Sequence, residues 1–166
     1  MPSYRAPLRD MRFVFEELLD AYTLLQTLPE QREFTADLGG AILEEAAKLA
    51  ENVLAPLNGP GDKQGCQYDP QTRSVRTPDG FKAAYQQFAE GGWTALACTP
   101  RFGGQGLPMS LNMMKSEMMG TANWSFTMYP GLSLGCMNTI MQYGDEKQKN
   151  TYLPKLVSGE WTGTMN

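Results

Sequence analysis

The chain has 166 residues, a length that suits one domain with a sizeable buried core. Hydrophobic residues make up 42% of it and charged residues 19%, which favours a packed globule over a disordered chain. The net charge of −4 argues against a nucleic-acid-binding protein, and no apolar stretch approaches the roughly 18 residues of a membrane span.

The first half of the chain predicts two helices and a loop. Asp10 can cap a helix over residues 11–25, whose apolar face would carry Val14, Leu18, Tyr22 and Leu25. A second helix over residues 35–54 repeats apolar side chains at spacings of three and four, namely at Leu38, Ile42, Ala46, Leu49 and Val53. We expect Pro56 to end it and residues 55–78 to form a loop, with a small hairpin around Asp69-Pro70.

The second half predicts four further helices. Thr77 is a candidate N-cap, with Pro78 at the first helical position, for a helix that carries Phe81, Tyr85 and Phe88 and ends at Gly91-Gly92. Three more helices follow over residues 110–119, 125–143 and 145–158. About six helices with almost no strand indicate an all-α protein, a helical bundle.

Cysteine and histidine usage excludes several kinds of site. Cys66, Cys98 and Cys136 are odd in number and more than thirty residues apart, which is typical of free thiols in a reducing compartment. Because the chain has no histidine, it offers no zinc site at the usual spacing and no Ser-His or Cys-His catalytic pair. The start shows no apolar signal core and no Arg/Ser-rich transit peptide, so we expect a cytoplasmic protein.

Methionines crowd two of the predicted helices. One holds Met113, Met114, Met118 and Met119, with Met109 just before it, and the next holds Met128, Met137 and Met141. Small residues such as Gly120, Gly131 and Gly135 interleave with them. Two interpretations stay open: a methionine-rich core, and a slot between the two helices for a flexible acyl chain.

A glycine-rich loop carries the first of two more specific motifs. Gly103-Gly104-Gln105-Gly106 lacks the lysine of a P-loop and the preceding strand of a dinucleotide fingerprint, so on its own it predicts a tight corner between helices. The loop follows Trp93, Pro100 and Phe102. The second motif runs over residues 143–160 as Tyr-Gly-Asp-Glu-Lys-Gln-Lys-Asn-Thr-Tyr-Leu-Pro-Lys-Leu-Val-Ser-Gly-Glu.

Together these two motifs resemble those of the acyl-CoA dehydrogenase family, in which they bracket helices of the N-terminal domain. The resemblance covers residues 35–166, while residues 1–30 resemble an extra N-terminal segment of a longer bacterial subgroup. It implies three parts: an extension over residues 1–30, a helical domain over residues 31–160, and the start of an absent β domain at residues 161–166, which we expect to be a strand. The chain would then be the front of a flavoenzyme that removes hydrogen from the α and β carbons of an acyl-CoA thioester.

The resemblance also implies site residues and partners. Phe126, Pro130 and Leu134 match positions that line the family's acyl pocket, with Met113 and Met118 as neighbours, and Met165 corresponds to a flavin-touching position. No catalytic residue is assigned, because the family's glutamate base lies in the absent C-terminal domain; Glu117 corresponds to an ordinary helical position. The full-length parent would use FAD, which this fragment is not expected to hold, and an electron-transfer flavoprotein, and it would be a homo-oligomer.

Two other functions stay open. The parent could belong to the alkylation-response branch of the same flavoprotein superfamily, which binds DNA and calls for a basic surface. Alternatively, the chain could be a free-standing helical interaction module with a closed, polar surface. The acyl-CoA dehydrogenase hypothesis predicts instead an exposed apolar face around Trp161 and the methionine-rich helices.

Overall fold

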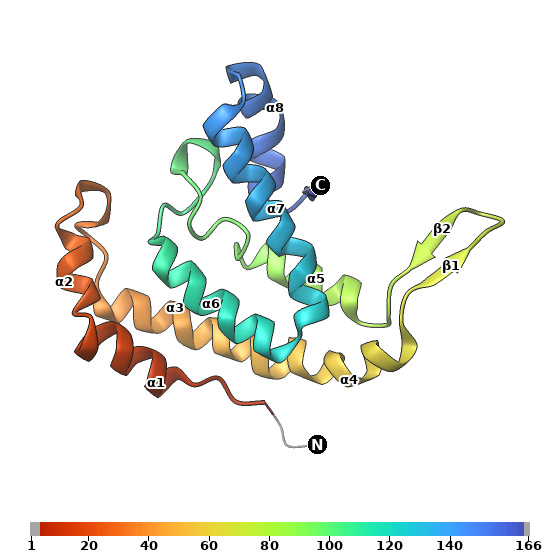
Figure 1. The fold of residues 1–166 in the computed structure, drawn as a ribbon, viewed down its shortest axis with the longest axis horizontal. Helices are drawn as coiled ribbons and strands as arrows, with labels where there is room; N and C mark the ends of the chain where they lie inside the picture. The colour runs from red at the N-terminus through yellow and green to blue at the C-terminus, as the bar shows by residue number, and fades with distance from the viewer. Residues whose placement is uncertain (1–3, 165–166) are drawn as a thin grey trace.

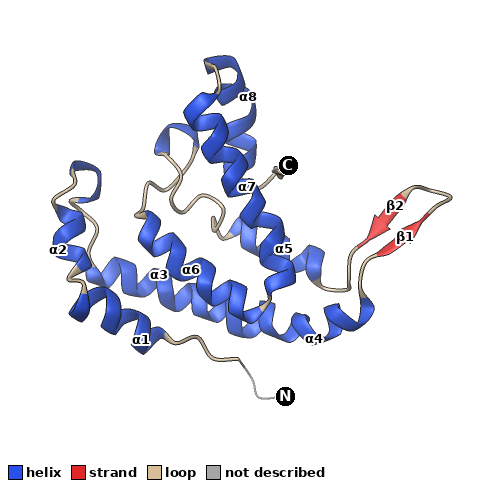
Figure 2. Cartoon of the chain, in the orientation of Figure 1, coloured by secondary structure: helices blue, strands red, loops and turns tan. Residues whose placement is uncertain are grey.

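The computed structural model describes residues 4–164, and this part of the chain is almost entirely helical (Figures 1 and 2). Its α-helices are α1 (Leu8–Arg12), α2 (Ala21–Gln26), α3 (Ala36–Leu49), α4 (Ala55–Gln64), α5 (Phe81–Glu90), α6 (Met109–Ala122), α7 (Trp124–Tyr143) and α8 (Glu146–Val157). Two π-helical segments, η1 (Phe13–Leu18) and η3 (Ala50–Leu54), and two 3₁₀ turns, η2 (Pro29–Gln31) and η4 (Pro100–Phe102), connect them. The expected all-α fold is confirmed.

The main core lies where α3 and α6 run side by side, with α1 on the outer side of α3 (Figure 1). Small and aliphatic residues of α3 and η3 meet larger side chains of α6, and these core residues are fully or almost fully buried: Leu43, Ala46, Ala50, Leu54, Leu111, Met118 and Met119. A second cluster joins α7 and α8 to the loop before α6 through Ala95, Phe102, Met137, Leu153, Leu156 and Val157. The fold therefore has two packed parts, one around α3 and α6 and the other around α7 and α8.

The predicted helix over residues 11–25 is wrong in three respects. Asp10 lies inside α1, which begins after Pro7, and the helix breaks at Asp20, whose φ is +43°. The side chains of Val14 and Leu18 are 43% and 66% exposed, while Met11 and Phe15 are buried. The wider turns of the π-helical segment η1 rotate the helix surface, so a face drawn at 3.6 residues per turn picks the wrong side chains there. Beyond the break, Tyr22 and Leu25 pack against the core as predicted.

The second predicted helix begins correctly at its Thr35 N-cap but does not end at Pro56. A π turn intervenes, in which the N–H of Ala55 donates to the carbonyl of Ala50, and Pro56 then falls in the first turn of α4. A proline there loses no hydrogen bond, so the helix continues through Gln64. The buried face of α3 is also shifted, because Leu38 is exposed whereas Gly39, against Tyr22 and Phe34, is buried.

The hairpin is confirmed as β1 (Gln67–Asp69) paired antiparallel with β2 (Ser74–Arg76). It projects from the end of α4 (Figure 2). The predicted Thr77 N-cap is wrong, since α5 begins at Phe81 after Gly80, whose φ is +86°. The N–H of Asp79 donates to Gln64 Oε1 at 2.9 Å and its carboxylate pairs with Arg76 at 2.7 Å, so this segment is held against α4 and β2 outside the helix.

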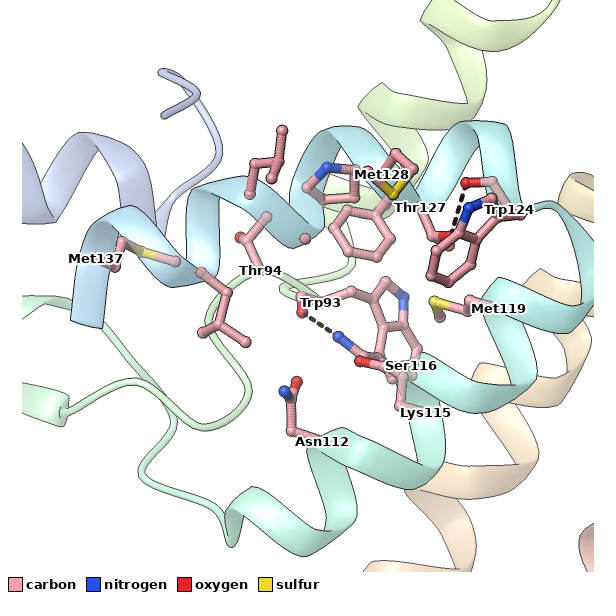
Figure 3. Close-up of a pocket in the computed structure, with 15 residues that line it drawn as sticks. Trp93, Thr94, Asn112, Lys115, Ser116, Met119, Trp124, Thr127, Met128 and Met137 are labelled. Atoms are coloured by element: carbon pink, nitrogen blue, oxygen red, sulfur yellow. Dashed lines mark hydrogen bonds between the residues drawn. The ribbon is translucent and has the colours of Figure 1, made fainter. Parts of the chain in front are cut away.

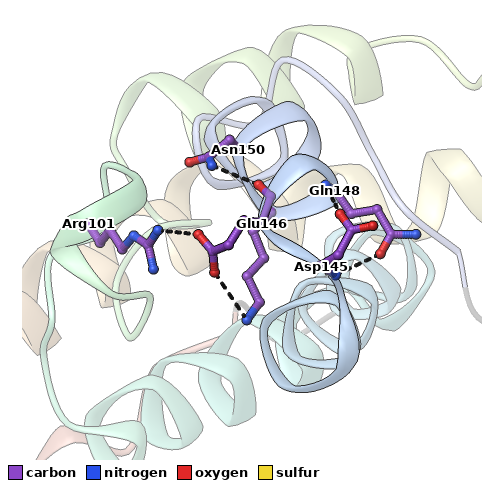
Figure 4. Close-up of polar contacts among 6 residues, drawn as sticks. Arg101, Asp145, Glu146, Gln148 and Asn150 are labelled. Carbon is purple, nitrogen blue, oxygen red and sulfur yellow. Dashed lines mark hydrogen bonds and ion pairs between the residues drawn. The ribbon is translucent and has the colours of Figure 1, made fainter.

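The last three predicted helices are confirmed as α6, α7 and α8. Asn123 caps α7 by accepting from the Phe126 N–H at 3.0 Å. Asp145 and Gln148 form a capping box at the start of α8, with reciprocal bonds of 2.7 and 2.9 Å (Figure 4). Of the strand expected at residues 161–166, residues 161–164 are not in a strand, and Met165 lies outside the described residues.

Candidate functional site

A cavity of about 250 Å³ separates α6 from α7 (Figure 3). Its floor comes from α6, its roof from α7 and one end from the chain that leaves α5. The residues that line it are Phe88, Trp93, Thr94, Asn112, Lys115, Ser116, Met119, Trp124, Thr127, Met128, Pro130, Gly131, Leu132, Leu134 and Met137. No aspartate or glutamate is among them.

The two long walls differ in character. The α7 wall is mainly apolar, and Gly131 within it leaves open space where a side chain would stand. The α6 wall places Asn112, Lys115 and Ser116 on one stripe, because residues three and four apart share a helix face. The side chains of Asn112 and Lys115 rise from α6 toward Trp93 (Figure 3). The cavity is therefore amphipathic, with one polar and one apolar side.

Lys115 is the most unusual of these residues, since only 6% of it is exposed. Its Nζ donates to the carbonyl of Trp93 at 3.2 Å and lies 5.5 Å from the centroid of the Phe88 ring. No carboxylate of the described residues pairs with it. Burial therefore lowers the pKa of Lys115 from its ordinary 10.5 to about 8, and the neighbouring Cys98 offsets only part of that effect.

The side-chain amide of Asn112 is similarly underused. The residue is 3% exposed, and in the described part of the chain its side chain makes one hydrogen bond, a long one of 3.6 Å to Met109 Sδ. The thiol of Cys98 donates to the Thr94 carbonyl at 3.6 Å, and burial raises its pKa. Burying an amide and an ammonium with unused N–H donors lowers the stability of the fold unless another group accepts hydrogen bonds from them.

The structure separates the acyl-pocket residues expected from the resemblance. Pro130 and Leu134 line the cavity between α6 and α7. Phe126 does not: it is 4% exposed and packs on Phe88 and Phe81, at 5.9 and 6.3 Å between ring centroids. It lines a second hollow of about 640 Å³ on the opposite side of α7, near the base of the hairpin.

The expected methionine neighbours do not line the cavity. Met113 is 62% exposed on the outer surface of α6, and Met118 is fully buried toward α3. Instead, the methionines that line the cavity are Met119, Met128 and Met137. Sequence reasoning also missed Asn112 and Lys115, although their spacing from Ser116 and Met119 on one helical stripe was the signal that could have found them.

The glycine-rich loop is structural. The N–H groups of Gly103, Gly104, Gln105 and Gly106 all donate to carbonyls within the preceding turn, at 3.0–3.1 Å for the first three and 2.9 Å for the last. A Cβ at Gly104 would overlap the carbonyl of Cys98, so glycine is required there. With its amides already bonded, the loop has no donors to offer a phosphate.

The same loop anchors α8 to the rest of the fold. Arg101 pairs with Glu146 at 2.5 Å, and Lys149 lies 3.8 Å from the same carboxylate (Figure 4). Gln31 Nε2 donates to the carbonyl of Gly106 at 2.9 Å from the other side. The loop is therefore a corner that joins three parts of the molecule.

The glycine-rich loop and the segment after α8 both make hydrogen bonds within the chain. The glycine-rich loop has no spare amides, and the segment after α8 is bound to α7 through Ser133 and Gly163, with the Gly163 N–H donating to Ser133 Oγ at 3.0 Å. A flavin needs donors for its pyrophosphate and a slot for its ring. The backbone amides of the glycine-rich loop are bonded within the chain and are therefore not available to a pyrophosphate.

An exposed apolar surface runs along α7, α8 and the segment after α8. Its large side chains are Trp124, Met128, Tyr129, Leu132, Tyr143, Tyr152 and Trp161. Tyr152 and Trp161 lie 6.2 Å apart between ring centroids, and Tyr129 Oη is 3.0 Å from Thr162 Oγ1. An apolar surface of this kind is typical of a contact with another structural unit.

The helices and the acidic side chains of the described residues bear on two other kinds of site, a membrane span and a metal site. None of the helices there is long and apolar enough to cross a bilayer. Across residues 4–164, no group of three or more Cys, Asp or Glu side chains is placed to hold a metal ion.

Comparison with known proteins gives a consistent result. Residues 40–160 match the family model described as "Acyl-CoA dehydrogenase, N-terminal domain". The chain is 35% identical, over 99% of its length, to a 3-methylmercaptopropionyl-CoA dehydrogenase of Ruegeria pomeroyi, and 32% identical, over 98%, to a butyryl-CoA dehydrogenase of Syntrophomonas wolfei. It spans 27% of the length of each of these curated relatives.

Solved structures agree on the fold. The chain superposes on a butyryl-CoA dehydrogenase of Megasphaera elsdenii with a TM-score of 0.60 at 21% identity, covering 77% of this chain and 31% of the other. A second match, in a structural study of an electron transferring flavoprotein of Acidaminococcus fermentans, also has a TM-score of 0.60, at 20% identity, and covers 78% of this chain and 31% of that one. At these identities the likeness concerns the fold alone.

Proposed function

The chain belongs to the acyl-CoA dehydrogenase family, and we propose that it forms the acyl-binding helical part of a flavin-dependent enzyme that dehydrogenates an acyl-CoA thioester. The observation that carries this proposal is the cavity between α6 and α7, which has room for a short acyl chain and a mainly apolar roof. Pro130 and Leu134 would contact the acyl chain from α7.

This part of the enzyme would bind and position the acyl chain and exclude water, while the base and the flavin contacts come from other parts of a longer polypeptide. The exposed apolar surface of α7, α8 and Trp161 supports this division, because another domain packed there would bury it. FAD bound by the complete polypeptide would supply the oxidising chemistry of this dehydrogenation. An electron-transfer flavoprotein would then take the electrons, and a homo-oligomer is the assembly we propose.

Gly131 provides a direct test of the cavity. A Cβ built there meets no other atom within 4 Å, so a larger side chain can enter the cavity without a backbone clash. In the complete polypeptide that carries this chain, Gly131→Phe should lower kcat/KM for butyryl-CoA at least about tenfold by filling that space. The matched control Gly131→Ala should retain activity and gain roughly 1 kcal/mol of stability from its higher helix propensity.

The outcomes separate clearly. Equal activity of Gly131→Phe and Gly131→Ala, with both variants folded by circular dichroism, would show that the acyl chain does not enter this cavity. A second measurement tests the division of labour: the 166-residue chain alone should bind no flavin and turn over no acyl-CoA. A yellow, flavin-loaded preparation of that chain would contradict the proposal.

A further inference from the structure

The polar floor of the cavity carries the only charge on its walls. Lys115 is the single ionisable side chain that lines the cavity, and within residues 4–164 no carboxylate lies within ion-pairing distance of it. The seven ion pairs of the described chain all lie elsewhere. The cavity, which is bordered on the α7 side by the exposed Trp124, Met128 and Leu132, therefore carries a single positive charge in a chain of net charge −4.

The hydrogen bonds of Lys115 leave donors unused. An ammonium group has three N–H donors, and one of them bonds to the Trp93 carbonyl at 3.2 Å. The Phe88 ring, 5.5 Å from Nζ to its centroid, offers a weak attraction to the cation but no hydrogen-bond acceptor of the usual kind. Asn112, one helical turn before Lys115, also has spare amide hydrogen-bonding capacity on the same stripe.

From these contacts we infer that the cavity binds the distal carboxylate of an ω-carboxyacyl thioester, held by Lys115 and Asn112. This inference rests on the proposed function and specifies its substrate class. A carboxylate accepts only, and it has two oxygens with about four acceptor positions, which matches an ammonium and an amide side by side. Folding has already desolvated Lys115, so an incoming anion is attracted strongly in this low-dielectric site.

The size and the opposite wall favour an acyl chain over other anions. At about 30 Å³ per water-sized unit, roughly eight such units fill the 250 Å³, enough for a carboxylate and several methylenes. The methylenes would contact Pro130 and Leu134 on the apolar α7 wall. The phosphates of CoA need a solvated, multi-donor surface, which a cavity with one buried ammonium does not provide.

The inference is tested with two thioesters of equal chain length, adipoyl-CoA and hexanoyl-CoA, which differ in a terminal carboxylate against a methyl group. Trp93 and Trp124 line the cavity, so their fluorescence reports binding in the complete polypeptide that carries this chain. Wild type should bind adipoyl-CoA about tenfold more tightly than hexanoyl-CoA, the gain typical of a charge-assisted contact.

The variants assign the preference to Lys115. Lys115→Met removes the charge and keeps the volume, so hexanoyl-CoA should become the tighter ligand. Lys115→Gln keeps a donor without the charge and should give an intermediate ratio. The matched control Lys147→Met removes an exposed lysine of α8 and should leave the wild-type ratio unchanged.

Each other outcome overturns the inference. Equal binding of the two thioesters, or tighter binding of hexanoyl-CoA by wild type, refutes the carboxylate preference and leaves the proposed acyl cavity standing. An adipoyl preference that survives Lys115→Met shows that the carboxylate binds elsewhere. If wild type binds neither thioester, the acyl cavity itself is refuted along with the inference.

Discussion

Helix α6 presents two faces that differ in how completely they are packed. Toward α3, Leu111 and Met118 are fully buried in a core cluster that contains several alanines and leucines. Toward α7, Asn112, Lys115 and Ser116 border a cavity of about 250 Å³. The α3-facing side of α6 therefore contributes to stability through close packing. The α7-facing side is less closely packed, and its polar groups border a space that a ligand can enter.

The difference arises from small residues on the partner helices. On α3 and η3, Ala46, Ala47 and Ala50 let α6 approach closely, and large side chains of α6 fill the remaining volume. On α7, Gly131 is small too, but a Cβ built there would meet no other atom within 4 Å, so no side chain of α6 fills that space. Small residues therefore give close packing on one side of α6 and an open space on the other.

The largest expected effect tests the packed face. Leu111→Ala should lower the free energy of unfolding by about 4 kcal/mol, because the close-packed α3 side cannot collapse into the void. Met113→Ala, on the exposed side of the same helix, is the control and should change stability by less than about 0.5 kcal/mol. Urea denaturation of both variants decides, and equal losses would show that the two positions are packed alike.

The sequence predicted α7 and α8 well because their signals are local. Asn123 and Asp145 each cap their own helix by accepting a hydrogen bond from the backbone N–H three residues ahead, and such a bond depends on the local sequence alone. The helix over residues 11–25 failed because η1 changes the number of residues per turn, which depends on tertiary packing. The prediction that Pro56 ends the second helix was wrong for the same reason, because the π turn of η3 places Pro56 in the first turn of α4, where its missing N–H costs no hydrogen bond.

The candidate site was only partly predictable. Pro130 and Leu134 came from the resemblance, and both line the cavity, although their binding role stays a prediction. The sequence could not distinguish Met118 from Met119, because both are buried in the main core and a rotation of about 100° between neighbouring residues is enough to bring Met119 alone to the edge of the cavity. Lys115 was overlooked because a lysine in a helix is usually solvated, and only the structure shows that it is buried.

The second prediction uses pH to measure the charge on the open face. Lys115 has a pKa of about 8 when folded and 10.5 ordinarily, so between these values the unfolded chain binds more protons and stability rises with pH. Relative to Lys115→Met, wild type should gain about 3 kcal/mol as the pH rises through this window, from 2.5 pKa units at 1.36 kcal/mol each.

Taking the difference between the two proteins removes the effects of groups that titrate in the same range away from Lys115, such as the partly buried Tyr85. It does not remove the effect of Cys98, because the Lys115 charge itself lowers the pKa of that thiol, so a Cys98→Ser background is used for both proteins. Denaturation of both proteins at several pH values, from neutral to alkaline, measures this difference. A constant difference across the window would mean that Lys115 is as well solvated in the folded protein as in the unfolded chain.

The third prediction concerns Asn123, whose side chain joins the start of α7 to η3. Asn123 is fully buried, caps α7 and donates to the carbonyl of Leu54 at 3.1 Å in η3. Asn123→Ala should cost about 2 kcal/mol, since it removes the cap and leaves the Leu54 carbonyl unpaired. Asn123→Asp keeps the cap acceptor but not the donor, and it should also be destabilising. An alanine variant as stable as wild type would show that neither bond contributes.

The smallest effect repeats the Leu→Ala change on the open face. Leu134 is partly buried and borders the cavity, so it has fewer neighbouring atoms to lose than Leu111. Leu134→Ala should therefore cost only about 1 kcal/mol, well below the loss at Leu111. The enlarged cavity should also admit a bulkier acyl group, so kcat/KM for a branched thioester should rise relative to butyryl-CoA in the complete polypeptide. If the two leucines cost the same, the α7 side is as tightly packed as the α3 side, and the space between α6 and α7 is closed in solution.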